Sequence, residues 1–552
     1  MVVSSRCKLT KMLKLIVSFV LIVSVCAQSN TFSLNILHYN DFHARFEETN
    51  IEGGICVQNE EEPCIAGFPR LVTKIREALS KEPQSLLLNG GDSFQGTIWY
   101  NLLGWNVTQD FMNMIPHDAH VLGNHEFDNG IEGVVPYLES LDAPVVASNI
   151  IDDEEPSIQG LFKPSIIVER NGTQIGIIGV IISTTDNLAS PGKLKFTDEV
   201  ESVRLEAEKL NSQGVKIIVV LSHCGVDIDR QIALHGGPYI DIIVGGHSHT
   251  LLYNGEPPDT SAFSPQGSYP IVVQQETRPV LIVQAAAHTQ YLGEIKLKFD
   301  EGGNLLEWTG NPHYIGNETE QAPDVLRKVN EYLPLIEERA NEVVGESMVY
   351  LESRCASREC NLGNFICEAF LHAVLDRAEG DNWHYAHFCI INQGGIRGTI
   401  TAGNVSFAEL LLSTPFENKV EAFKLKGEHI LEMLEHSAIN EPYDGARTLQ
   451  TSGMRAVIDG SRPANNRVVS VVIRCIECQV PRYEPLDPGK FYTVVSQSFI
   501  GGGGDAFTMI SDNRIDVEDV GLDYLVIMDY FGAYSPVFMD EDARMQIINP
   551  GA

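Results

Sequence analysis

Acids, amides and histidines end apolar, strand-like runs at five places in this chain. They are Asp41 with His43, Asp92, Asn124 with His125, His223, and His247 with His249. Strand ends are rigid enough to hold two divalent cations close together, and many hydrolases attack phosphate esters with such a pair. The pattern therefore predicts that these residues can hold a pair of metal ions.

The carboxylates suit this chemistry. Asp41 and His43 share one side of an extended segment, because alternate residues share a face, so a carboxylate and an imidazole can hold one cation. Asp92 follows Gly90 and Gly91, where the backbone can approach an ion closely. A carboxylate at that position can bridge two metals.

Neutral ligands complete the set. Asn124 offers a carbonyl oxygen to the second ion, and His223 with His247 add nitrogen ligands. Nitrogen ligands favour zinc, with calcium and magnesium as alternatives. Taken singly, an aspartate after a strand is usually a turn or helix cap, and a lone histidine is usually a satisfied polar group. The ordered set is what makes the prediction specific.

Short apolar runs bounded by Gly, Asn and Asp alternate with helical stretches, which indicates an α/β class. The runs of the first part are Leu34–Leu37, Ser85–Leu88, Ile175–Ile178, Lys216–Leu221 and Asp241–Val244. A second set comprises Phe388–Ile391, Val468–Ile473 and Tyr492–Val495. Between them, residues 322–346 carry apolar side chains at helical spacing among charges, which predicts an exposed linker helix that starts near Pro323, with a kink at Pro334. We therefore expect domains at 28–320 and 347–552, joined by a helix at 321–346.

The first 27 residues resemble a secretory signal peptide. Basic residues precede the apolar run Leu15–Cys26, and a small-residue cleavage site follows. The alternative is an N-terminal membrane anchor, but the run is short for a span. No other stretch could cross a bilayer, and residues 539–552 lack the hydrophobic tail of a lipid-anchor signal. The mature protein is expected to be secreted and extracellular, without a stable membrane anchor.

Cysteines and sequons fit that compartment. Eight of the eleven cysteines fall into local groups that predict disulfides: Cys56 with Cys64, Cys355 with Cys360, Cys367 with Cys389, and Cys475 with Cys478. A zinc site is the alternative for the last pair. Cys7 and Cys26 lie in the predicted signal peptide, so Cys224 is left over as a free thiol. Candidate glycosylation sites are Asn106, Asn171, Asn317 and Asn404.

The formal charge of −35 excludes nucleic acid as a partner, because such a field repels polyanions. Small nucleotides remain compatible with it. A phosphate substrate then requires metals and arginines that overcome the field locally.

The motifs resemble the metallophosphatase half of the 5′-nucleotidase family. They are Leu37-His-Tyr-Asn-Asp-Phe-His43, Gly91-Asp92, Gly123-Asn-His-Glu-Phe-Asp128, Ser222-His-Cys-Gly225 and Gly245-Gly-His247. The resemblance covers nearly the whole mature chain and is strongest to ecto-5′-nucleotidases and secreted salivary apyrases of arthropods. It implies a calcineurin-like domain, a layered α/β/β/α sandwich, followed by a C-terminal α/β 5′-nucleotidase domain.

The resemblance also implies roles for residues. One metal would be held by Asp41, His43 and Asp92, and the other by Asp92, Asn124, His223 and His247. His249 stays outside the ligand set, because many family members have another residue there. His125 and Asp128 match a catalytic dyad, and Arg45 is placed to meet phosphate. In the second domain, Asn392, Arg397, Phe416, Phe507 and Asp512 match the nucleoside-binding residues, with the two rings stacking on the purine.

One position departs from the family. Ala356 stands where ecto-5′-nucleotidases commonly carry an arginine, which puts strict monophosphate selectivity in doubt; Arg358 is a candidate substitute. We therefore expect an apyrase-like enzyme that hydrolyses extracellular ATP and ADP to AMP and phosphate, with an anti-platelet role if it is salivary. A soluble 5′-nucleotidase that converts AMP to adenosine is the alternative, and a non-catalytic secreted binding protein is the alternative of another class. The oligomeric state is not predicted.

Overall fold

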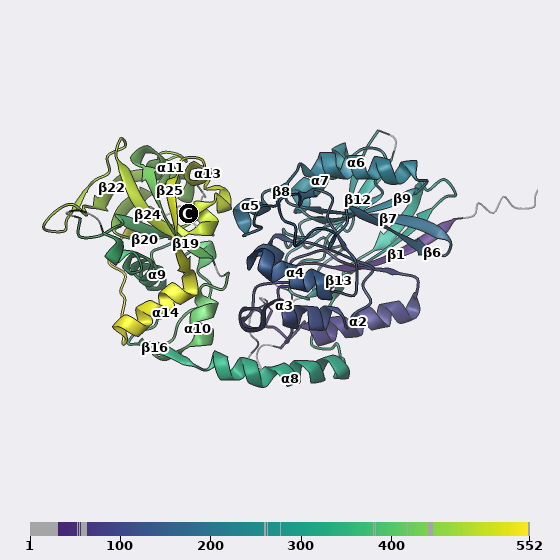
Figure 1. The fold of residues 1–552 in the computed structure, drawn as a ribbon, viewed down its shortest axis with the longest axis horizontal. Helices are drawn as coiled ribbons and strands as arrows, with labels where there is room; N and C mark the ends of the chain where they lie inside the picture. The colour runs from purple at the N-terminus through teal and green to yellow at the C-terminus, as the bar shows by residue number, and fades with distance from the viewer. Residues whose placement is uncertain are drawn as a thin grey trace, which may run out of the picture.

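The computed structural model describes residues 31–549 except 52, 54–55, 57–62, 259–260, 262, 277, 379, 381, 417 and 440–444. Two lobes lie side by side and are bridged along one edge by helix α8 (Pro323–Ala340), as Figure 1 shows. The signal peptide predicted at residues 1–27 lies outside the described residues. Within those residues, no helix has the length and apolarity that crossing a membrane requires.

Two sheets form the first lobe. The first has the order β14-β13-β1-β2-β3-β4, with β15 beside β13: β1 (Phe32–Tyr39), β2 (Leu86–Asn89), β3 (Ala119–Val121), β4 (Val145–Val146), β13 (Tyr291–Phe299), β14 (Leu305–Gly310) and β15 (His313–Tyr314). The second has the order β11-β12-β10-β9-β7-β6: β6 (Ser165–Arg170), β7 (Thr173–Ile181), β9 (Ile217–His223), β10 (Ile242–Val244), β11 (Ile271–Gln274) and β12 (Pro279–Val283). A separate short pair joins β5 (Ile150–Ile151) and β8 (Lys195–Phe196).

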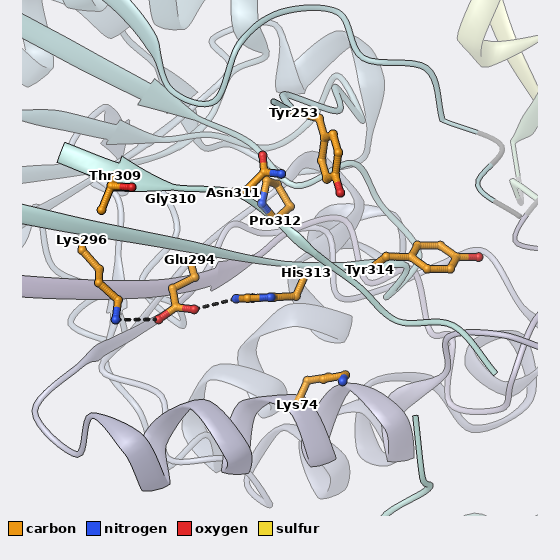
Figure 2. Close-up of a pocket in the computed structure, with 10 residues that line it drawn as sticks. All are labelled: Lys74, Tyr253, Glu294, Lys296, Thr309, Gly310, Asn311, Pro312, His313 and Tyr314. Atoms are coloured by element: carbon orange, nitrogen blue, oxygen red, sulfur yellow. Dashed lines mark hydrogen bonds and ion pairs between the residues drawn. The ribbon is translucent and has the colours of Figure 1, made fainter. Parts of the chain in front are cut away.

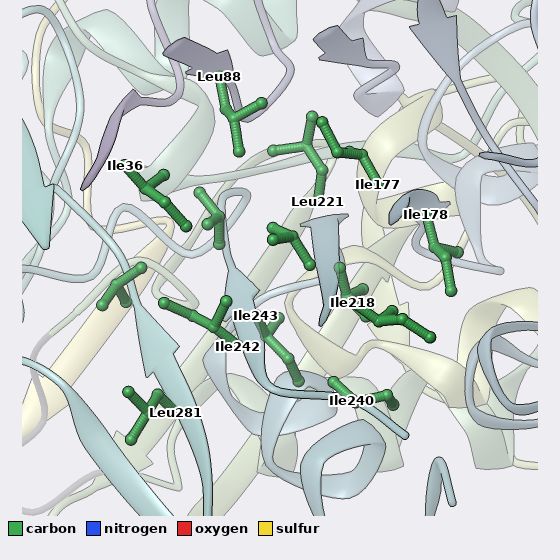
Figure 3. Packing of buried hydrophobic residues seen from close by; sticks show 14 of the residues in the cluster. Ile36, Leu88, Ile177, Ile178, Ile218, Leu221, Ile240, Ile242, Ile243 and Leu281 are labelled. Atoms are coloured by element: carbon green, nitrogen blue, oxygen red, sulfur yellow. The ribbon is translucent and has the colours of Figure 1, made fainter. Parts of the chain in front are cut away.

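Alternation along the strands sends side chains to two cores. In β1, Leu34 and Ile36 join the apolar core shared with the second sheet, whereas Leu37 and Tyr39 join the core under the outer helices. Figure 3 shows the first of these cores. The outer helices of the first sheet are α2 (Phe68–Lys81), α3 (Ile98–Met112) and α4 (Gly130–Ser140), and those of the second are α6 (Glu199–Ser212) and α7 (Val226–His235). The expected α/β/β/α layering is confirmed.

The second lobe is also mixed α/β. A five-stranded sheet has the order β20-β17-β24-β19-β25: β17 (Phe388–Asn392), β19 (Lys419–Lys426), β20 (Leu449–Ser452), β24 (Phe491–Gln497) and β25 (Ile515–Leu522). A four-stranded sheet has the order β23-β22-β21-β26: β21 (Met454–Asp459), β22 (Val468–Arg474), β23 (Tyr483–Pro485) and β26 (Met545–Ile548). A pair joins β16 (Val343–Ser347) to β18 (Gly403–Ser406). The principal helices are α9 (Asn361–His372), α10 (Phe407–Ser413), α11 (Gly427–Ser437) and α14 (Asp523–Tyr534).

Helix α8 is less exposed than the sequence suggested. Val325, Val329 and Ile336 are buried in the same apolar core as the residues of α2 and α3. At its far end, the Arg339 guanidinium lies 4.6 Å from the centre of the Phe407 ring on α10. The helix therefore packs on the first lobe and contacts the second.

Three of the four predicted disulfides are formed: Cys56–Cys64, Cys355–Cys360 and Cys475–Cys478. The prediction for Cys367 and Cys389 was wrong for this structure, because both are buried free thiols, and Cys367 Sγ lies 3.8 Å from the carbonyl oxygen of Gln450. Burial, together with Cys367, raises the pKa of the Cys389 thiol. Cys224 is a buried thiol, as predicted.

The sheet core yields a stability prediction. Ile243 on β10 is fully buried between neighbouring strands, so Ile243→Ala leaves a cavity and is expected to lower the free energy of unfolding by about 2–5 kcal/mol. Ile167→Ala is the matched control, because Ile167 on β6 is 42% exposed and should change stability by about 0.5 kcal/mol. Urea denaturation measures both variants, and equal losses would contradict the burial of Ile243.

Candidate active site

The carboxyl ends of five strands meet at one place in the first lobe. Strands β1, β2 and β3 run parallel in the first sheet, and β9 and β10 run parallel in the second, so their carboxyl ends share an edge. The predicted ligands occupy these ends: Asp41 and His43 after β1, Asp92 after β2, Asn124 after β3, His223 at the end of β9, and His247 after β10.

Three overlapping groups of ligand atoms result, each within 4.8 Å: Asp41 with His43 and His249, His43 with Asp92 and His125, and Asp92 with His223 and His247. Asp92 belongs to two of the groups, which is the position of a bridging carboxylate. Its Oδ2 atom lies 3.8 Å from His43 Nε2 and 3.0 Å from His223 Nε2.

His249 is closer to the first group than the sequence analysis allowed. Its Nε2 atom lies 3.2 Å from Asp41 Oδ1 and 3.1 Å from His43 Nε2. The structure therefore places His249 beside the predicted ligands, although the resemblance gave it no role in either ligand set.

Hydrogen bonds orient the second group. The Nδ1 atom of His223 donates to the carbonyl oxygen of Gly90 at 2.7 Å, which leaves its Nε2 atom directed toward Asp92. Asn124 Oδ1 lies 2.9 Å from His247 Nδ1, so the predicted amide ligand lies within this group.

Backbone conformation at these positions is unusual. Asp41, His43, Asp92, His247 and His249 all have φ between 49° and 72°, in the left-handed region that side chains disfavour. Such conformations persist only when the surroundings impose them, and they cluster at functional sites.

These residues fit divalent cations. Buried Asp41 Oδ1 and His223 Nε2 make no hydrogen bond, although buried polar atoms nearly always have a partner. Burial lowers the pKa of His43 to about 3, and burial with His223 lowers that of His247 to about 4, so both imidazoles are neutral as ligation requires. Burial works to lower the pKa of His223, but Asp92 outweighs it and raises that pKa to about 9, so a cation bound there would displace a proton. Burial works to raise the pKa of Asp92, but His223 and His125 outweigh it and hold that pKa well below its usual range.

The predicted dyad forms beside the ligands. His125 belongs to the short helix η1 (Asn124–Phe127), and its Nδ1 atom lies 2.7 Å from Asp128 Oδ2. Its backbone N–H donates to Asp92 Oδ1 at 3.0 Å. Burial works to lower the pKa of His125, but Asp128 and then Asp92 outweigh it and raise that pKa to about 10.

Two arginines from different lobes interact electrostatically. Arg45 donates to the carbonyl oxygens of His43 and Gly53 at 2.5 and 3.1 Å. Burial lowers its pKa to about 9, and the second cause is the positive charge of Arg397 in the other lobe. The Arg397 guanidinium lies 5.2 Å from the centre of the Phe416 ring.

The other predicted nucleoside residues are less uniformly placed. Asn392 donates to Asp505 Oδ2 at 2.7 Å, while its buried Oδ1 atom has no partner. Phe416 is half-buried and Asp512 is exposed. Phe507 exposes no surface, because it packs in the core with its ring 4.8 Å from that of His436. The structure therefore brings Phe416 and Arg397 together but does not present Phe507 to a base.

Ala356 contributes to the local structure through its backbone. Its carbonyl oxygen accepts hydrogen bonds from Gly445 N and Thr448 Oγ1, at 3.0 and 2.5 Å. The Arg358 side chain is 53% exposed and pairs with Glu352 and Glu541 at 3.8 and 3.4 Å. Arg358 therefore does not replace the missing cation.

A separate pocket of about 440 Å³ lies between α2 and strands β13 to β15, as Figure 2 shows. Its charged groups are paired: Glu294 lies 2.6 Å from His313 and 3.9 Å from Lys296, and Lys74 lies 3.8 Å from Glu77. It contains none of the predicted site residues.

Comparison with known proteins agrees with this geometry. Residues 34–251 match the family model for calcineurin-like phosphoesterase, and residues 343–512 match that for the 5′-nucleotidase C-terminal domain. An apyrase of Tabanus yao is 42% identical over 524 residues, covering 94% of each chain. A 5′-nucleotidase of Bos taurus is 36% identical over 93% of this chain and 91% of that one. A solved 5′-nucleotidase precursor of Thermus thermophilus is 32% identical, with a TM-score of 0.74 over 94% of this chain and 100% of that one.

The dyad gives a pH prediction. At pH values below about 10, His125 is cationic in the structure, so a step that needs the imidazolium fails as the pH rises through that value. Asp128→Asn removes the partner that raises this pKa most, so the alkaline loss of kcat should move to lower pH by about 1–3 pH units. The pH dependence of phosphate release measures the shift. An unchanged alkaline limb would show that Asp128 does not act through His125.

Proposed function

Because this chain belongs to the 5′-nucleotidase family, a group of nucleotide phosphohydrolases, we propose that it is apyrase-like and hydrolyses ATP and ADP to AMP and phosphate. The observation that supports the substrate choice is that Arg45 and Arg397 belong to different lobes and interact electrostatically, because the positive charge of Arg397 lowers the pKa of Arg45. Its sequence similarity to an apyrase of Tabanus yao also supports it.

A calcineurin-like phosphoesterase fold implies a dinuclear divalent metal site, and the clustered acids and imidazoles are candidate ligands. We propose Asp41, His43 and Asp92, with His249 beside them, for one ion and Asp92, Asn124, His223 and His247 for the other. Their nitrogen content favours zinc. When bound, such cations supply Lewis-acid stabilisation of phosphoryl oxygens and activation of the attacking water.

His125 then acts on the transferring phosphoryl group. Asp128 fixes the ring through Nδ1, which leaves Nε2 free to donate to a phosphoryl oxygen or to the leaving oxygen. The raised pKa of His125 keeps that proton on the ring near neutral pH. Negative charge that develops in the transition state is thus met by a preorganised cation.

Arg45 and Arg397 favour a polyphosphate. Two guanidinium groups that approach one another repel, and an anion between them removes that penalty. Arg45 donates a hydrogen bond to the carbonyl oxygen of His43, so its guanidinium group is held next to a proposed metal ligand.

A 5′-nucleotidase activity on AMP is the second candidate, because the chain is also similar to the 5′-nucleotidase of Bos taurus over nearly its full length. Ala356, where the family arginine is missing, argues against strict selectivity for AMP. A non-catalytic binding protein is disfavoured by the intact ligand and dyad positions.

We further propose that the protein is secreted. Four sequons lie at exposed asparagines, namely Asn106, Asn171, Asn317 and Asn404, where a glycan could be attached without disturbing the core. If the protein is salivary, removal of extracellular ADP would oppose platelet aggregation.

The deciding experiment measures phosphate release from ATP, ADP and AMP separately, with and without chelator, and with zinc, calcium or magnesium restored. Release from ATP and ADP but not from AMP is expected, and chelation should abolish it. Asp92→Asn, which keeps the size but removes the bridging charge, should be folded and inactive. Cleavage of AMP would select the 5′-nucleotidase, and no release at all would select the binding protein.

Arg45→Gln tests the polyphosphate argument. Loss of a charge-assisted contact of about 1.5–3 kcal/mol should lower kcat/KM for ADP by about 10–100-fold. Arg358→Gln is the matched control, because that arginine pairs with surface acids, and it should leave kcat/KM unchanged. An Arg45 variant with wild-type kcat/KM for ADP would remove this support for a polyphosphate substrate.

A further inference from the structure

Glu126 is a buried carboxylate between two loops of the candidate site. It is only 2% exposed and belongs to η1, directly after Asn124 and His125. Buried acids require compensation, and here it comes from the backbone.

Each carboxylate oxygen of Glu126 accepts hydrogen bonds from two backbone N–H groups. Oε1 accepts from Ser93 at 2.7 Å and from Phe94 at 3.1 Å. Oε2 accepts from Gly123 at 2.6 Å and from Asp92 at 3.1 Å. One side chain thus binds the loop after β2 to the loop after β3.

These hydrogen bonds hold a strained loop. Asp92 has φ 52° and Gly91 has φ 88°, so the chain turns through the left-handed region where the three N–H groups of Asp92, Ser93 and Phe94 converge on Glu126. Successive N–H groups around one anion form a concave anion site, and here the anion is part of the protein. The direction of the Asp92 side chain depends on this turn.

The two loops are also in close contact. His125 N donates to Asp92 Oδ1 at 3.0 Å, and a Cβ atom added at Gly123 would lie 2.1 Å from that same oxygen. A small displacement of one loop relative to the other would therefore change the distance from Asp92 to both Asn124 and His125.

We infer that Glu126 is a positioning residue that sets the placement of Asp92 relative to Asn124 and His125. Both of its oxygens are occupied by backbone N–H groups, so it acts by holding the two loops in register. The inference rests on the proposed metal site for its consequences, since residues that orient ligands commonly change metal affinity or activity by about 10–100-fold.

Glu126→Gln tests the role with the full-length protein. The amide keeps the side-chain size but turns one acceptor oxygen into a donor that faces N–H groups. Calorimetric titration of the metal-free protein with Zn²⁺ should show affinity weakened by about 10–100-fold. The kcat for ADP should fall by a similar factor with KM unchanged, because the nucleoside contacts lie in the other lobe.

Glu359→Gln is the matched control. Glu359 is likewise buried and accepts from Asp542 N and Met545 N at 2.9 and 3.1 Å, but it lies in the second lobe. Its variant should lose thermal stability while Zn²⁺ affinity and kcat stay at wild-type values. Because Zn²⁺ titration needs no nucleotide, it remains decisive even if the proposed substrate is wrong.

Gly123→Ala is measured in parallel and separates the loops with Glu126 intact. Its φ of −99° accepts alanine, so the added methyl group acts through its clash with Asp92. The same loss of Zn²⁺ affinity is expected. Unchanged affinity in either folded variant overturns the inference, and so does failure of both variants to fold, which would assign Glu126 to stability alone.

Discussion

The electrostatics of two buried carboxylates govern the first lobe. Asp41 and Asp92 are almost fully buried and lie beside one another, so each disfavours the ionisation of the other. A buried negative charge is tolerated only where cations and hydrogen-bond donors surround it. Five imidazoles and the neutral amide of Asn124 surround these carboxylates. The backbone N–H groups of His125 and His247 donate hydrogen bonds to Asp92 and Asp41, respectively. The strained turns bring these groups together, and the rigid strand ends hold the turns in their left-handed conformations.

Much of this could be predicted from the sequence, because it is encoded locally. Each ligand follows its own apolar run, and the runs became β1, β2, β9 and β10 as expected. Parallel order then forces the strand ends to one edge. The features that escaped prediction depend on contacts between distant residues. His249 lies next to His43, 206 residues away, and Glu126 bonds to backbone N–H groups of the β2 loop, 32 to 34 residues away.

Burial was the other quantity that local pattern could not supply. The spacing of Val325 and Val329 on α8 indicated a helix but not that this face would pack on the first lobe. Matching a motif at Phe507 likewise gave no information about what covers the ring, which His436 and the surrounding core determine. A pair of nearby cysteines suggested a bond, whereas Cys367 and Cys389 remain thiols in the structure.

Each lobe contributes one arginine near the candidate site. The chain carries a net charge of −35, a field that opposes the arrival of any nucleotide. In the first lobe, Arg45 donates a hydrogen bond to the carbonyl oxygen of His43, and in the second, the guanidinium group of Arg397 lies over the Phe416 ring. A phosphate between the lobes would meet cations from both, whereas the acids of the first lobe stay buried and paired. Because the candidate ligands belong to one lobe and Ala356, Asn392 and Arg397 to the other, we expect substitutions in the second lobe to alter nucleotide preference without disturbing the strained loops around Asp41 and Asp92.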